Sequence, residues 1–207
     1  MSKHITRKFR AVSLLLLVGL FGLIGCKNPF ATREPEPPEQ TKPTNWKQPT
    51  KATDVLENLQ NAIQDKNVAN YLLCFTDKPT NGRHFGFVPD RNARIRYPGV
   101  WDSWTLAQEQ TYISNMFQSI PPDSVPALLF VGEVVENPAA DSTVLVQEYE
   151  LHIPHSRSGT QFPRVARGRA EFHLSLNEQG YWAIFLWIDD AFEGVPCWSD
   201  VKAVFSQ

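Results

Sequence analysis

The chain has 207 residues, of which 42% are hydrophobic and 20% are charged, and its formal net charge is -2 at pH 7. Nucleic-acid-binding domains use a dominant basic field to attract phosphates, and a chain with this balance of charges has no such field. We therefore expect no nucleic-acid partner.

Residues 1–25 have the layout of an export signal. Basic residues come first, and an apolar run of about 14 residues follows, which is shorter than the roughly 20 that a membrane-spanning helix needs. The run ends in Leu23-Ile24-Gly25-Cys26, which resembles the lipobox of bacterial lipoproteins. The resemblance implies that the signal is cleaved before Cys26 and that this cysteine carries a lipid that anchors the chain to the cell envelope. An uncleaved signal anchor is the alternative.

Residues 26–51 are predicted to be the lipidated cysteine and a disordered tether. Prolines recur here among Glu, Thr, Lys and Gln, and such a composition buries too little apolar surface to offset chain entropy. Lys27 follows the cysteine, where the lipoprotein resemblance would make Asp the signal for retention in the inner membrane. The outer membrane is therefore favoured if the cell has one.

Residues 52–207 are predicted to form one α+β domain that begins with helices. Apolar residues at helical spacing predict a first helix capped by Thr53 or Asp54 and a second helix over residues 68–75. A third helix is predicted after Ser103, and its core-facing stripe contains Tyr112, Ile113, Met116, Phe117 and Ile120.

The segment between the second and third predicted helices contains a brief strand over residues 84–88 and an arginine-rich loop. The loop contains Arg91, Arg94 and Arg96. A solvated loop is the commoner explanation of such a run, and contact with an anionic polymer is the alternative.

The apolar period then changes to two, which predicts strands over residues 127–136, 143–153, 164–176 and 181–189. In the third strand, small and apolar residues alternate with charged ones, so the sheet should have one covered and one wet face. Its inward residues are predicted to be Ala166, Gly168, Ala170, Phe172 and Leu174. Pairing this strand with the one before it, with Tyr149 opposite Gly168, places Glu148 across from Arg169 and Glu150 across from Arg167.

The last predicted strand is apolar on both faces, which implies cover on both sides. The helices cover only one of them. We expect the tail around Trp198, Val201 and Phe205 to cover the outer side, and a homodimer is the alternative.

The predicted order, helices followed by an antiparallel meander, resembles that of a known superfamily. The segments DVLENLQNAIQDKNVANYLLCFTD (Asp54 to Asp77) and GYWAIFLWIDD (Gly180 to Asp190) resemble the nuclear-transport-factor-two-like, or cystatin-like, superfamily, which includes SnoaL-like cyclases and ketosteroid isomerases. The resemblance implies a cone in which N-terminal helices pack on the concave face of a curved antiparallel sheet of four to five strands. Members range from isomerases to binding and assembly modules, so the resemblance implies no particular function or active-site residue.

The inner face of this cone is the predicted place for a small apolar ligand. Gln147 and Tyr149 are the polar residues on that face, and His84 or Tyr112 approaches from the rim. An apolar cavity with one or two polar groups is typical of small-molecule sites. A filled core with a hydrogen-bonded tyrosine hydroxyl is the simpler alternative.

Other chemistry-bearing residues predict no metal site, cofactor or catalytic group. His152 and His155 have no third ligand nearby in the sequence. Cys74 and Cys197 either pair or remain buried thiols, and the helical setting of Cys74 favours the thiols.

Asp189 and Asp190 are neighbours on a strand and therefore point to opposite faces, so they do not easily share a substrate.

We favour a non-enzymatic envelope lipoprotein that binds the membrane through Cys26 and that binds a partner, itself or an apolar ligand through the cone. A SnoaL-like isomerase or cyclase, which requires an ionisable group buried in the cavity, is the alternative.

Overall fold

The computed structural model describes residues 45–76 and 83–207. The predicted signal, Cys26 and most of the predicted tether lie outside these residues. Among the described residues, no helix is both long enough and apolar enough to cross a membrane.

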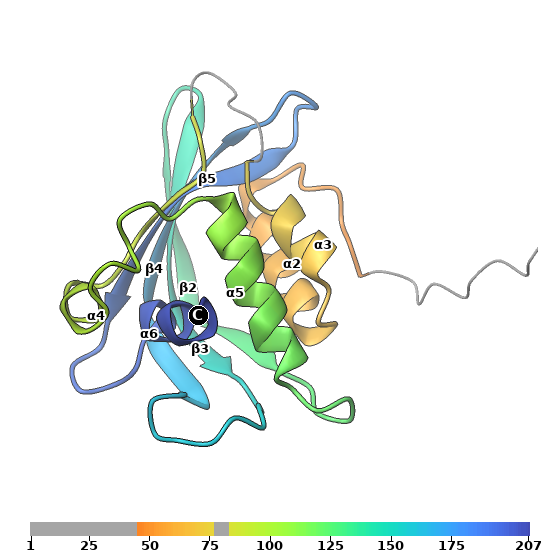
Figure 1. Cartoon of the computed structure of the whole chain (residues 1–207). Coiled ribbons are helices and arrows are strands. Elements are labelled where there is room, and N and C mark those ends of the chain that lie inside the picture. Colours follow the sequence, from red (N-terminus) through yellow and green to blue (C-terminus); the bar gives the residue numbers. More distant parts are fainter. Residues whose placement is uncertain (1–44, 77–82) are drawn as a thin grey trace, which may run out of the picture. The chain divides into compact units, whose positions relative to one another are not determined.

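Five strands form one mixed sheet in the order β1-β5-β4-β3-β2 (Figure 1). They are β1 (Gly86–Val88), β2 (Ala127–Pro138), β3 (Ser142–His152), β4 (Val165–Leu176) and β5 (Trp182–Ala191). The pairs β2–β3, β3–β4 and β4–β5 are antiparallel, as predicted. Strand β1 instead runs parallel to β5, because it enters the sheet from the helical half of the chain and forms no hairpin with its neighbour. The predicted four- to five-stranded sheet is therefore present and antiparallel except at this edge.

The predicted register of β3 and β4 is confirmed. Tyr149 lies opposite Gly168, Glu148 opposite Arg169, and Glu150 opposite Arg167. Arg167 Nε donates to Glu150 Oε2 at 2.6 Å. The other arginine bonds to the neighbouring strand instead, where Arg169 Nη2 donates to Asp190 Oδ2 at 3.3 Å. The predicted inward side chains of β4 are buried: Ala166, Ala170, Phe172 and Leu174.

The helices α2 (Ala52–Gln64), α3 (Val68–Leu73), α5 (Leu106–Gln118) and α6 (Trp198–Phe205) cover one face of the sheet (Figure 1). Helix α2 begins earlier than predicted, because the carboxylate of Asp54 accepts the backbone N–H of Lys51 at 2.9 Å. Helix α5 is capped by Thr105 and not by Ser103. Its predicted apolar stripe is buried.

Two segments that were not predicted to be helical form helices. The arginine-rich segment forms α4 (Arg91–Arg96), because Asp90 Oδ1 accepts the backbone N–H groups of Asn92 and Ala93 at 2.8 and 3.0 Å. The C-terminal tail forms α6, which packs on the inner face of the sheet against Trp187. The tail therefore does not cover the outer side of β5, and that prediction was wrong.

Residues 45–51, which the sequence analysis placed in the tether, are bonded to the folded domain. The backbone N–H of Lys47 donates to Asn58 Oδ1 at 3.0 Å, and Asn58 Nδ2 donates to Lys47 O at 2.7 Å. The carbonyl of Pro49 accepts the N–H of Trp182 at 2.9 Å. The described core lies between Ala52 and Phe205 within one compact unit, so residues 45–207 carry a complete core of their own.

Candidate functional site

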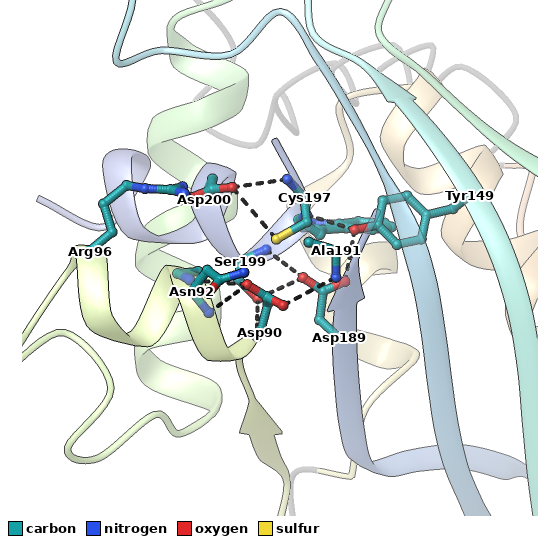
Figure 2. A network of polar contacts seen from close by, with 11 residues as sticks. Asp90, Asn92, Arg96, Tyr149, Asp189, Ala191, Cys197, Ser199 and Asp200 are labelled. Carbon is teal, nitrogen blue, oxygen red and sulfur yellow. Dashed lines mark hydrogen bonds and ion pairs between the residues drawn. The ribbon is translucent and has the colours of Figure 1, made fainter. Parts of the chain in front are cut away.

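A buried polar network joins the inner face of the sheet to the first turn of α6 (Figure 2). The hydroxyl of Tyr149, on β3, donates to Asp189 Oδ1 at 2.7 Å and accepts the backbone N–H of Trp198 at 2.7 Å. Asp189, near the end of β5, also accepts the backbone N–H and the hydroxyl of Ser199 at 2.7 and 2.6 Å. The network therefore fastens α6 to β3 and β5, the two strands that flank β4.

Helix α6 fills the interior in which an apolar ligand was expected. The ring of Trp198 lies edge-on to the rings of Trp187 and Tyr149, with centroids 4.5 and 5.1 Å apart. Trp198, Val201 and Phe205 are all fully buried. The protein's own C-terminal helix thus takes the place of a ligand against these strands.

Three of the four predicted cavity residues lie inside the domain. Besides Tyr149, Gln147 is buried and its Nε2 donates to a backbone carbonyl of β2 at 2.6 Å. Tyr112 is also buried, and its hydroxyl accepts the indole N–H of Trp198 at 2.7 Å. His84 is exposed ahead of β1. The polar groups of the inner face are therefore bonded to the protein itself, as in a filled core.

Burial controls the protonation of this network. It raises the pKa of Asp189, although the donors Ser199 and Tyr149 act in the opposite direction. It also raises the pKa of the Tyr149 hydroxyl well above its ordinary value, and that of the Cys197 thiol. Cys197 and Cys74 are both buried free cysteines. A thiol and a phenol with raised pKa values stay protonated at neutral pH, so neither is an activated nucleophile.

A groove of about 930 Å³ lies outside this network, between α4, residues 160–163 and the chain that joins β5 to α6. Its apolar lining includes Tyr97, Phe192 and Pro196, and its polar lining includes Asn92, Arg96 and Gln161. The ring of Phe192 is 39% exposed and adds apolar surface to the groove. Apolar surface with a few polar groups around it suits the binding of a ligand or of a partner's side chains.

Charged residues hold the walls of the groove together (Figure 2). Arg96 of α4 forms an ion pair with Asp200 of α6, which raises the pKa of the guanidinium, and the Arg96 side chain is still 53% exposed. On the other side, Asp90 Oδ2 accepts the backbone N–H of Ala191 at 3.3 Å, while the N–H of Asp90 donates to Ser199 Oγ at 3.0 Å. These contacts join α4 both to α6 and to the end of β5, and the three elements together form one wall of the groove.

The sequence did not predict a role in the site for Asp189. It also did not predict the ion pair between Arg96 of α4 and Asp200 of α6. Asp189 and Asp190 lie on opposite faces, as predicted, and the side chain of Asp189 is buried. The alternation that points Trp187 inward predicts this. A helix at the position of α6 could also have been predicted, because Trp198, Val201 and Phe205 are spaced along one helical face.

Among the residues that the structure describes, no three His, Cys, Asp or Glu side chains gather as a metal site. His152 Nε2 instead lies 2.6 Å from Glu150 Oε1. His155 is buried, and its ring packs against the rings of Phe162 and Phe205. The two histidines thus have separate partners.

Solved structures share the architecture of this domain. A nuclear transport factor 2 (NTF2-like) superfamily protein from Salmonella enterica is 12% identical with a TM-score of 0.51, and the match covers 69% of this chain and 91% of that one. A Novosphingobium aromaticivorans protein, provisionally named an aromatic ring hydroxylase, is 15% identical with a TM-score of 0.50, over 72% and 92% of the two chains. A Nostoc punctiforme protein of unknown function with a cystatin-like fold is 8% identical with a TM-score of 0.46, over 70% and 90%.

These identities show a common fold and nothing more specific. The sequence matches no protein-family model and no curated protein. The domain has the α+β fold of NTF2-like proteins, with helices packed against a five-stranded sheet, as the sequence resemblance implied.

Proposed function

We propose that the chain is a lipid-anchored protein of the bacterial cell envelope whose cone domain is a non-enzymatic binding or assembly module. The occupied interior carries this proposal, because α6 lies where a substrate would have to sit and is bonded to Tyr149 and Tyr112. The open groove beside α4 is then the surface that receives a ligand or a partner. The anchor rests on the resemblance of residues 23–26 to a lipobox.

The pair of Asp189 and Tyr149 favours a second function, a SnoaL-like isomerase or cyclase that acts on a small apolar substrate. A buried carboxyl group with a raised pKa, 2.7 Å from a tyrosine hydroxyl, has the character of a general acid or base. A substrate would reach this pair only after α6 had left the interior. The occupied interior therefore favours the binding module.

The anchor is tested by replacing the cysteine in the full-length chain. Cys26→Ser should abolish labelling by a palmitate analogue and leave the precursor uncleaved, because the lipid is attached through that thiol. Cys74→Ser is the matched control and should be labelled like the wild type, since Cys74 is buried in the folded domain. Labelling of the Cys26→Ser chain would overturn the assignment.

The binding surface is tested by photo-cross-linking in the membrane-anchored protein. A photoreactive phenylalanine analogue at Phe192, in the groove, should give discrete adducts, whose mass distinguishes a second copy from another molecule. The same analogue at Leu176 is the control, because Leu176 is 43% exposed, close to the 39% of Phe192, and lies near the opposite end of β5, beside Trp182. An identical pattern at both positions, or no adduct at Phe192, would contradict a role for the groove.

A further inference from the structure

Lys202 and Glu109 form a fully buried ion pair in the interior. Both side chains are 0% exposed, and Lys202 Nζ donates to Glu109 Oε1. Opposite charge alone does not make such a pair stabilising, because the attraction between the two groups must offset the cost of removing both from water. The surroundings of the pair therefore determine what it contributes.

Four aromatic rings surround the ammonium group. Lys202 Nζ lies 4.0, 4.1, 5.1 and 5.5 Å from the ring centroids of Trp187, Phe87, Tyr112 and Trp104. All four distances are within the roughly 6 Å at which the face of an aromatic ring attracts a cation. Proteins that recognise ammonium ligands use aromatic cages of this type.

The carboxylate of Glu109 is held in position without any help from α6. Its Oε1 accepts the hydroxyl of Tyr71, on α3, at 2.7 Å, and its Oε2 accepts the indole N–H of Trp104 at 2.6 Å. Glu109 itself lies on α5, and the rings come from β1, β5, α5 and the segment before α5. Only the lysine comes from α6, so the groups that recognise the ammonium belong to other elements.

We propose that the interior of the cone is a binding site for a primary alkylammonium group and that Lys202 is its built-in ligand. The carboxylate of Glu109 receives the charge and the N–H donors, and the rings enclose the remaining surface of the cation. This site is separate from the groove and extends the function proposed above. Burial lowers the pKa of Lys202 to about 8, so its ammonium group is still protonated at neutral pH, as the site requires.

The test is chemical rescue in residues 45–207. Lys202→Ala removes the side chain beyond Cβ, and n-propylammonium supplies the missing carbons and nitrogen. At ten times its dissociation constant this compound should raise the midpoint of thermal unfolding of Lys202→Ala by about 3–6 °C. The wild type, whose site is filled, should respond no more than it does to sodium chloride at the same ionic strength. The neutral 1-propanol should give no such rise in Lys202→Ala.

The control variant is Glu109→Gln combined with Lys202→Ala, which keeps the rings and the space and removes the carboxylate. We expect it to bind n-propylammonium at least about tenfold more weakly, because a charge-assisted hydrogen bond is lost. Equal stabilisation by 1-propanol, or an equal response of the double variant, would overturn the proposal. If Lys202→Ala folds only with an additive, refolding with n-propylammonium and not with 1-propanol supports the proposal, and failure to refold with n-propylammonium contradicts it.

Discussion

Gly168 lies where β4 passes closest to the buried network. A Cβ atom at this position would lie 2.5 Å from the backbone oxygen of Asp190 and 2.8 Å from the hydroxyl oxygen of Tyr149. The small inward residues of β4 were expected to leave space for a ligand. At Gly168 the space is taken by the Tyr149 side chain and by the neighbouring strand.

Gly168→Ala should therefore lower the free energy of unfolding by about 1–3 kcal/mol, because the added methyl group forces β4 or Tyr149 to move. Urea unfolding of residues 45–207 measures the change. Gly86→Ala is the matched control, since its new Cβ would meet the Leu186 side chain at an ordinary 3.8 Å. If both variants lost the same free energy of unfolding, the close approach at Gly168 would not be the cause of the loss.

Lys202 should make the stability rise with pH in the alkaline range. Burial lowers its pKa from 10.5 to about 8, against the attraction of Glu109. Between these values the unfolded chain still holds a proton that the folded chain has released, so the contribution of Lys202 favours folding more as the pH increases. The difference in unfolding free energy between the wild type and the double variant Glu109→Gln/Lys202→Met isolates this contribution. A difference that is constant or decreases above about pH 8 would contradict the lowered pKa.

Among the elements, β3 and β4 were the most predictable from the sequence. Apolar and charged residues alternate along most of β4 and along the second half of β3, which identifies the two faces, and the opposite charges of Glu150 and Arg167 agree with a single register. The apolar stripe of α5 was equally readable. These signals are local, because each one repeats several times within a single element.

The positions in the fold of α4 and α6, the helices that form the candidate site, could not be predicted from such local patterns. Helix α4 is short and arginine-rich, and of its residues only Ala93 is buried, so it has the pattern of a solvated loop. Helix α6 has an amphipathic pattern, which predicts a wet polar face, but Ser199, Asp200 and Lys202 are all buried, so the sequence does not place it inside the domain. The partners that make those polar residues acceptable in the interior come from distant parts of the chain.

Removing α6 should unfold the domain rather than open a usable cavity. A chain that ends at Pro196 exposes Tyr149 and Trp187 to water and deprives the buried carboxylate of Asp189 of both its Ser199 donors. We expect loss of a cooperative urea transition and strong binding of a hydrophobic dye. Removal of residues 206–207 alone is the control and should change little. A truncated domain that unfolds cooperatively and binds no dye would show that α6 is dispensable.

At the scale of the whole domain, the outer face of the sheet has a mostly apolar half and a charged half. Cross-strand ion pairs such as Glu150–Arg167 and Arg169–Asp190 occupy the charged half. The other half has half-buried or exposed apolar side chains on either side of the Glu171–His173 pair of β4: Val135, Val144, Val146, Leu186 and Ile188. Because α6 packs inside, the tail leaves this half uncovered, and we expect a second copy to cover it.

Self-association through this face should be abolished by Ile188→Lys. Ile188 lies opposite Glu171 on β4, so the new lysine has a cross-strand partner in the monomer and a desolvated charge in a dimer. Sedimentation velocity of residues 45–207 should show a dimer for the wild type and a monomer for this variant. Leu176→Lys should leave the dimer intact, because Leu176 is two residues after the buried Leu174 and therefore lies, like Leu174, on the side of β4 that faces away from the dimer. A wild-type domain that stays monomeric at millimolar concentration would rule the dimer out.

Whether α6 remains in the interior of the folded protein decides between a binding module and an enzyme. Native-state hydrogen exchange measures this directly, because it gives the free energy at which each backbone amide opens. We predict that the amides of Val201 to Phe205 open with the same free energy as those of Ala170 to Leu174 on β4, that is, only when the whole domain unfolds. Exchange of the α6 amides that is faster by orders of magnitude would mean that the helix detaches from the folded domain. The interior around Tyr149 and Asp189 would then be open to a substrate.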